Sequence, residues 1–158
     1  GDFAMRRKDR EMPEEFALSV ADKCEYALLA MTDSSGMPYA VPITIARDGK
    51  YIYFHSAKEG TKNDIMKCNN NVCVVCVGDT RRLEDKFTTE YESAIIKGTV
   101  FEVESDEEKI KALRLLCERH TPSNMENFDE AIKRSLSVTA IWKVEIISIA
   151  GKRKKSKS

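Results

Sequence analysis

The chain has 158 residues, 42% of them hydrophobic, which is enough for one globular domain with a single core. It carries 26 basic and 26 acidic side chains, but five of the basic ones crowd residues 152–157, so the rest of the chain is mildly acidic. An acidic body argues against a nucleic-acid-binding surface.

The predicted elements alternate between strands and short helices. Turn residues at 33–36 and 47–50 join neighbouring strands as hairpins, and residues 78–86 are expected to form a polar loop. In chain order the elements are a helix beginning at 12–16, strands at 26–32, 38–46 and 51–55, a short helix at 63–68, strands at 72–77 and 90–103, a helix after a capping box at 105–108, a helix at 128–136 and a strand at 138–149.

Six strands joined mainly by hairpins predict a mainly β fold with marginal helices. A closed or partly closed antiparallel barrel removes the exposed edges of so many strands. Pro42 lies inside a predicted strand, so that strand has a free edge there or a bulge. We expect a single domain over 5–151, an expression remnant at 1–4, and a disordered, solvated basic tail at 152–158.

The five cysteines indicate free thiols. An odd number of them fits a reducing cytoplasm, and no apolar run approaches the roughly 20 residues needed to span a bilayer. No signal-peptide pattern is present either, so we predict a cytoplasmic protein that does not cross a membrane. Cys73 and Cys76 have metal-ligand spacing, but on a strand they point to opposite faces, so no metal site is expected.

The segment from Tyr51 to Lys62 carries the clearest functional signal. An aromatic strand passes into a helix start that bears hydroxyl and lysine side chains, an arrangement suited to a phosphate group. The alternative is an ordinary strand–loop–helix connection with solvated lysines, and spacing alone favours neither. His55 lies where the strand ends.

The order of motifs resembles that of the split-barrel FMN flavoproteins related to pyridoxamine 5′-phosphate oxidase, closest to the 5-nitroimidazole-resistance (Nim) type. The resemblance covers about Met5 to Lys152 and is most specific at 53–62. Its further segments are Leu-Leu-Ala-Met at 28–31, Pro-Tyr-Ala-Val-Pro at 38–42, Asn-Asn-Asn-Val at 69–72, and Tyr-Glu-Ser at 91–93 ahead of Gly98.

The resemblance implies a six-stranded antiparallel split β-barrel that binds FMN between the two chains of a homodimer. The oxidases commonly have an Arg-Lys pair where this chain has Thr61 and Lys62, so phosphate binding depends more on the lysines. The implied cofactor contacts are the backbone of Tyr39, Val41, Pro42, Ile43 and Thr44 for the ring, His55 and Ser56 beside it, Thr61, Lys62 and Lys58 for the phosphate, and Ser93 as a further polar contact.

The implied function is an FMN-dependent oxidoreductase that reduces a small electron-poor acceptor, such as a nitroaromatic ring. His55 is the candidate catalytic residue, since an imidazole exchanges protons near neutral pH; its alternative is a structural role at the strand end. Oxidation of vitamin B6 is disfavoured, because the C-terminal arginines of those oxidases have no equivalent. The alternatives are a non-enzymatic flavin- or haem-binding protein, acting as a store or sensor, and a barrel without a cofactor. No nicotinamide-binding fingerprint identifies the electron donor.

Two further residues have structural interpretations. Trp142, the single tryptophan, is expected in the barrel interior or at a dimer seam. His120 follows Arg119 at the end of a predicted helix, where a cation complements the helix dipole.

Overall fold

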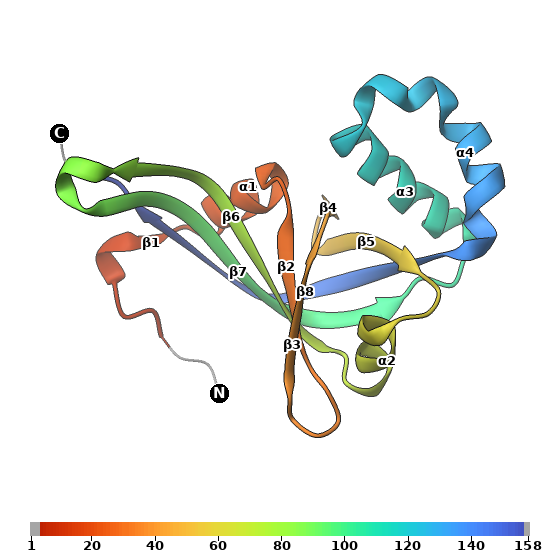
Figure 1. The fold of residues 1–158 in the computed structure, drawn as a ribbon, viewed down its shortest axis with the longest axis horizontal. Coiled ribbons are helices and arrows are strands. Elements are labelled where there is room, and N and C mark those ends of the chain that lie inside the picture. Colours follow the sequence, from red (N-terminus) through yellow and green to blue (C-terminus); the bar gives the residue numbers. More distant parts are fainter. Residues whose placement is uncertain (1–3, 157–158) are drawn as a thin grey trace.

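The computed structural model describes residues 4–156 and is mainly β, as predicted (Figure 1). Most of the expected 1–4 remnant therefore lies outside the described residues. The helices are α1 (Glu14–Lys23), α2 (Thr61–Cys68), α3 (Asp106–His120) and α4 (Phe128–Ser135), with short 3₁₀ turns η1 (Lys8–Arg10), η2 (Glu84–Lys86), η3 (Pro122–Asn127) and η4 (Leu136–Val138). The strands are β1 (Glu11–Met12), β2 (Ala27–Thr32), β3 (Pro38–Ile43), β4 (Ala46–Asp48), β5 (Tyr51–Ala57), β6 (Asn71–Leu83), β7 (Thr88–Glu102) and β8 (Thr139–Lys154).

The strands form one antiparallel sheet that does not close. Its order is β3-β2-β6-β7-β8-β5-β4, and β1 pairs with the end of β8. The prediction of six strands is wrong, because the described residues form eight. The expected strand at 38–46 is interrupted at Thr44 and Ile45. It therefore forms two strands, β3 and β4, which lie at opposite ends of the strand order. Glu11–Met12 adds a further short strand. Pro42 lies on β3, whose outer edge is free, as its position in the sequence predicted.

Residues 78–86 were expected to be a loop, but they extend a hairpin. After an irregularity between Val77 and Thr80, the pairing of β6 with β7 continues from Thr80↔Tyr91 to Leu83↔Thr88. This arm projects from the left of Figure 1. Its residues need no apolar face because they extend past the core, so the hydrophobic alternation typical of a strand is absent.

The described part of the basic tail begins within strand β8, where a disordered segment was expected. β8 continues through Lys152 and Arg153 to Lys154, and these residues pair with Tyr91, Glu92 and Ser93 of β7. The charged composition of this segment alone favours a solvated chain. Backbone pairing with β7, and with β1 at Lys152, instead keeps it in the sheet. Ser156 also has a partner in the sheet, because its backbone amide donates a hydrogen bond of 2.7 Å to the Glu90 carboxylate.

Two hydrophobic clusters hold the sheet and helices together. The larger one fills the interior and includes Leu29, Phe54 and Val74, each fully buried, with α1 packed against it. Trp142 belongs to this cluster, which confirms the barrel-interior alternative. The smaller cluster joins the other face of β5 and β8 to the layer formed by α3 and α4, seen at the upper right of Figure 1.

Local signals from the sequence account for specific features of the packing. The Glu108 amide donates to Ser105 Oγ at 3.2 Å, which confirms the capping box that begins α3. Gly98 allows β7 to approach β8, because a Cβ there would lie 2.2 Å from the Glu145 carbonyl oxygen. No helix among residues 4–156 is long and apolar enough to cross a membrane.

Candidate functional site

The connection from β5 to α2 presents an open helix N-terminus. Gly60 precedes α2 with φ of 154°, and no side chain caps the helix. The first N–H groups of an α-helix have no partners within the helix, and the helix dipole places partial positive charge beside them. Thr61 and Lys62 occupy this first turn and Lys58 precedes it; neither lysine forms an ion pair or hydrogen bond with a described residue. These features fit an anion such as a phosphate group.

Ser56 and Asn63 fix the shape of this connection from inside the barrel. The Asn63 side chain is 1% exposed and donates to the Ala57 carbonyl oxygen at 2.8 Å. Ser56 Oγ donates to Ala57 O and accepts from Trp142 Nε1 at 3.1 Å. The predicted cofactor residue Ser56 therefore turns its hydroxyl group inward, where it positions the loop ahead of α2.

His55 points to the opposite face of β5 from Ser56, as alternation along a strand requires. Its ring is exposed and makes no hydrogen bond with a described residue. Partial desolvation by the surrounding protein lowers the pKa of His55, and the positive charges of Lys62 and His120 lower it further. These effects favour the neutral form of the imidazole, in which one ring nitrogen can donate a hydrogen bond and the other can accept one.

The end of α3 closes the same corner of the molecule. His120 Nε2 lies 2.7 Å from the Ile45 carbonyl oxygen, which also accepts a hydrogen bond of 2.9 Å from Arg119 Nη1. Ile45 follows Thr44 between β3 and β4, so these hydrogen bonds attach the end of α3 to the segment that follows the predicted ring-binding strand. The sequence assigned Arg119 and His120 only to the helix dipole and did not predict that the charge of His120 lowers the pKa of His55.

The predicted ring-binding residues lie on and just after the free edge strand β3. Tyr39, Pro42 and Thr44 are exposed, whereas Val41 packs against the core and Ile43 is buried. β3 pairs only with β2, so the backbone groups on its other edge are available to a ligand.

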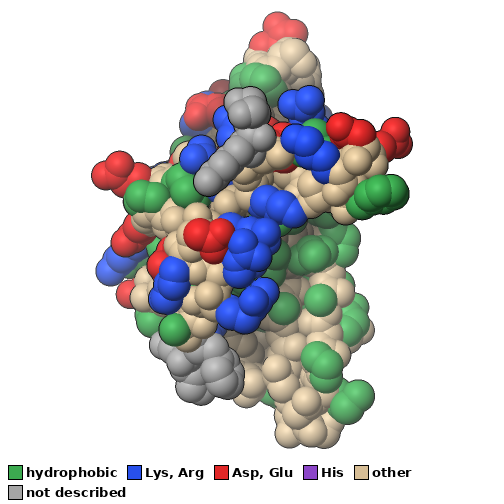
Figure 2. Space-filling model, turned by 90° about the vertical axis from the view of Figure 1, so that its left-hand side faces the viewer, with side chains coloured by type: hydrophobic (Ala, Val, Ile, Leu, Met, Phe, Trp, Pro, Cys, Tyr) green, Lys and Arg blue, Asp and Glu red, His purple; other side chains and the backbone are tan. Residues whose placement is uncertain are grey.

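Ser93 does not join the other predicted residues within one chain. It pairs with Val77 and Lys152 in the sheet and lines a separate cavity of about 460 Å³. The Val100 amide, seven residues along β7, bonds to Asn70 just beyond α2, so Ser93 lies roughly 23 Å along the strand from there at about 3.3 Å per residue. Lys8, Lys97 and Lys152 also line this cavity. Figure 2 shows that lysine and arginine side chains gather on the left-hand side of the molecule as drawn in Figure 1.

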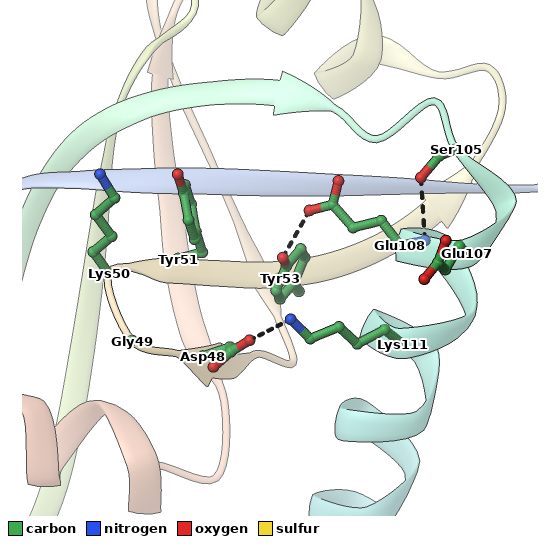
Figure 3. A pocket seen from close by; sticks show the side chains of 9 residues that line it. All are labelled: Asp48, Gly49, Lys50, Tyr51, Tyr53, Ser105, Glu107, Glu108 and Lys111. Atoms are coloured by element: carbon green, nitrogen blue, oxygen red, sulfur yellow. Dashed lines mark hydrogen bonds and ion pairs between the residues drawn. The ribbon is translucent and has the colours of Figure 1, made fainter.

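The cleft drawn in Figure 3 lies between the β4–β5 hairpin and the start of α3, and none of the predicted site residues lines it. It measures about 540 Å³, and its polar groups bind one another. The Tyr53 hydroxyl donates to Glu108 at 2.8 Å, and Lys111 lies 2.6 Å from Asp48. These contacts attach α3 to the sheet, so we do not assign the cofactor to this cleft.

The fold is mainly β and antiparallel, of the split-barrel type, and the helix start beside the end of β5 is uncapped. The sequence profile of the pyridoxamine 5′-phosphate oxidase family matches residues 14–153. The chain therefore belongs to the pyridoxamine 5′-phosphate oxidase family, which confirms the resemblance seen in its motifs. Comparison with curated protein sequences gives no match.

Solved structures support the same fold. A protein from Bacteroides thetaiotaomicron assigned to 5-nitroimidazole antibiotic resistance is 26% identical, with a TM-score of 0.76 over 90% of this chain and 86% of that one. The flavocytochrome Anf3 from Azotobacter vinelandii is 16% identical, with a TM-score of 0.82 over 97% and 73% of the two chains. An FAD- and haem-binding protein from Mycobacterium smegmatis is 19% identical, with a TM-score of 0.79 over 93% and 74%.

Proposed function

We propose that the protein binds FMN at the corner formed by β3, the end of β5 and the start of α2. The observation that carries this proposal is the uncapped α2 N-terminus, where Lys58 and Lys62 have no partner among the described residues. The phosphate is held by Thr61, Lys62 and the first amides of α2, with Lys58 as a further cation. The flavin ring lies along the free edge of β3, over residues 39–44.

We further propose that the flavin-loaded protein is an oxidoreductase for a small electron-poor acceptor, such as a nitroaromatic ring. Bound flavin supplies the electron transfer, and the chain supplies binding, orientation and a proton path. His55 stands at the end of β5 with a lowered pKa, so at neutral pH it first accepts a proton and then returns it as imidazolium. The similarity to the nitroimidazole-resistance structure supports this acceptor class.

A homodimer completes the proposed site. Leu28, Val75, Ile95 and Ala150 pair across four strands and share the outer face of the sheet, where Leu28 is 40% and Ile95 46% exposed. A second copy packed on this face covers these side chains and brings its Ser93 toward the flavin. A stable dimer of this kind buries more than about 2,000 Å² in total. Sedimentation showing a flavin-loaded monomer at micromolar concentration contradicts it.

A non-enzymatic flavin- or haem-binding function is the second candidate, because the structural neighbours include a flavocytochrome and an FAD- and haem-binding protein. The visible spectrum of the purified protein separates the two cofactors. Flavin gives absorption bands in the blue, whereas haem gives a Soret band and would make His55 a candidate axial ligand.

All five cysteines are free in the described chain, in keeping with a reducing cytoplasm.

The enzyme proposal is tested by reoxidation of the reduced, flavin-loaded protein with a panel of nitroaromatic and quinone acceptors. We expect at least one acceptor to reoxidise bound flavin faster than it reoxidises free reduced flavin. His55→Gln then slows turnover of that acceptor by roughly 10²–10⁴-fold while flavin binding is retained. Unchanged turnover in His55→Gln assigns the proton to another group, and no acceleration with any acceptor leaves the storage or sensor function.

A further inference from the structure

The cavity beside Ser93 is lined by more basic than acidic side chains among the described residues. It measures about 460 Å³ and is formed by β7, β8, the short strand β1 and the η1 turn. Its charged lining residues are Lys8, Glu11, Lys97 and Lys152, and Ser93 and Ser148 add hydroxyl groups. A cavity lined mainly by one sign of charge attracts ligands of the opposite sign, so this cavity is suited to an anion.

The sheet arranges these groups as two polar rows with an apolar row between them. The pairs, in order along β7, are Ser93↔Lys152, Ile95↔Ala150 and Lys97↔Ser148. Residues two apart on a strand point to the same face, so these six side chains share one face of the sheet. Ser93 and Lys97 are four residues apart, or roughly 13 Å at the rise of a strand. An organic anion with an apolar body fits a floor of this kind, with a cation at either end.

Lys152 is the best-placed cation of this cavity. It is half-buried and forms no ion pair with a described residue, and its Nζ lies 5.8 Å from the centre of the Tyr91 ring. Arg10 donates a hydrogen bond of 3.4 Å to the Tyr91 hydroxyl. Burial raises the pKa of Tyr91, but the contacts with Arg10 and Lys152 outweigh burial and lower it. By contrast, Lys8 already has a carboxylate within 3.9 Å, that of Glu11.

The proposed homodimer puts this cavity beside the flavin. The second copy covers Ile95 and Ala150, and Ser93 of the same cavity lies toward the flavin, so a ligand bound here lies at the interface. The FMN phosphate is assigned to the start of α2, and it therefore does not account for the cations of this cavity.

We propose that this cavity selects an acceptor with a carboxylate group on its electron-poor ring, an assignment that rests on the proposed function. Lys152 binds the carboxylate, Ser93 Oγ donates a hydrogen bond to it, and the ring lies over Ile95 and Ala150. With a nitro group as the acceptor, two electrons and two protons pass from the reduced flavin, and the products are a nitroso group, water and oxidised flavin. The carboxylate is unchanged by the reaction.

The first experiment compares para-nitrobenzoate with para-nitrobenzamide as acceptors for the reduced, flavin-loaded protein. The two molecules share the ring and the nitro group and differ in charge, and dividing each rate by that with free reduced FMN corrects for intrinsic reactivity. We expect kcat/KM to favour para-nitrobenzoate by about tenfold or more. Lys152→Gln should lose most of this preference and Lys152→Arg should retain it. The control Lys155→Gln removes an equal charge outside the residues that line the cavity and should also retain it.

Equal corrected rates for the two acceptors, or a preference that Lys152→Gln leaves unchanged, would overturn the carboxylate assignment while the oxidoreductase proposal stands.

The second experiment measures binding without turnover, by calorimetric titration of para-nitrobenzoate into the oxidised, flavin-loaded protein. We expect Lys152→Gln to weaken binding by about tenfold or more and Lys155→Gln to leave it unchanged. This result supports the anion site even where neither acceptor reoxidises the flavin, an outcome that refutes the enzyme proposal alone. No binding of para-nitrobenzoate, or equal binding by Lys152→Gln and the wild type, overturns the assignment of the cavity.

Discussion

Removing the charge of Lys62 tests the proposed phosphate site in quantitative terms. Lys62 lies in the first turn of α2, half-buried and without an ion-pair partner among the described residues. A hydrogen bond to a charged group contributes about 1.5–3 kcal/mol. At 1.4 kcal/mol per tenfold change in affinity, Lys62→Ala should weaken FMN binding by about 10- to 150-fold. The difference should shrink as salt is added, since this site is open to solvent.

The assay is quenching of flavin fluorescence on titration into the apoprotein. Lys67→Ala is the matched control, because it removes an equal charge from the last turn of the same helix. We expect this control to bind FMN nearly as tightly as the wild-type protein. Equal affinities for Lys62→Ala and the wild type, or equal losses in both variants, would refute the assignment of the phosphate to the start of α2.

Three further predictions concern the described structure. Gly98→Ala should destabilise the protein by at least about 1–3 kcal/mol in urea unfolding, because its Cβ meets a backbone carbonyl; a change below that range contradicts the close approach of β7 and β8. Ser56→Ala leaves Trp142 Nε1 without its partner and should cost about 1–3 kcal/mol in the same assay. By NMR, His55 should titrate below the usual value of about 6.5, and Lys62→Ala should raise its pKa. Since the unfolded state binds this proton first, His55 contributes stability that is present above pH 6.5 and lost as the pH falls.

The sequence predicted the elements whose periodicity or turn chemistry is local. The capping box at Ser105, the opposite faces of Cys73 and Cys76 and the edge position of Pro42 follow from nearest neighbours, and the structure confirms each. The β6–β7 arm and the end of β8 were missed because they lie beyond the core. Pairing with a neighbouring strand stabilises both segments, and their own composition does not identify that strand.

The candidate site could be predicted only where its residues are close together in the sequence. The segment from His55 to Lys62 is continuous in sequence, so its strand end and helix start could be derived together. The effect of His120 on the pKa of His55 joins residues that α2, β6, β7 and α3 separate in the chain, and it depends on how α3 packs against the sheet. Nothing in the local pattern of residues 119–120 distinguishes a carbonyl contact at Ile45 from an ordinary helix end.

Comparison of FMN with riboflavin tests the central claim most directly. The two ligands share the ring and the ribityl chain and differ by the phosphate that we assign to Thr61, Lys62 and the first amides of α2. Titrated separately into the same apoprotein, FMN should bind at least tenfold more tightly than riboflavin, with one FMN per chain. Equal affinities for the two ligands, or no binding of either, would contradict the account.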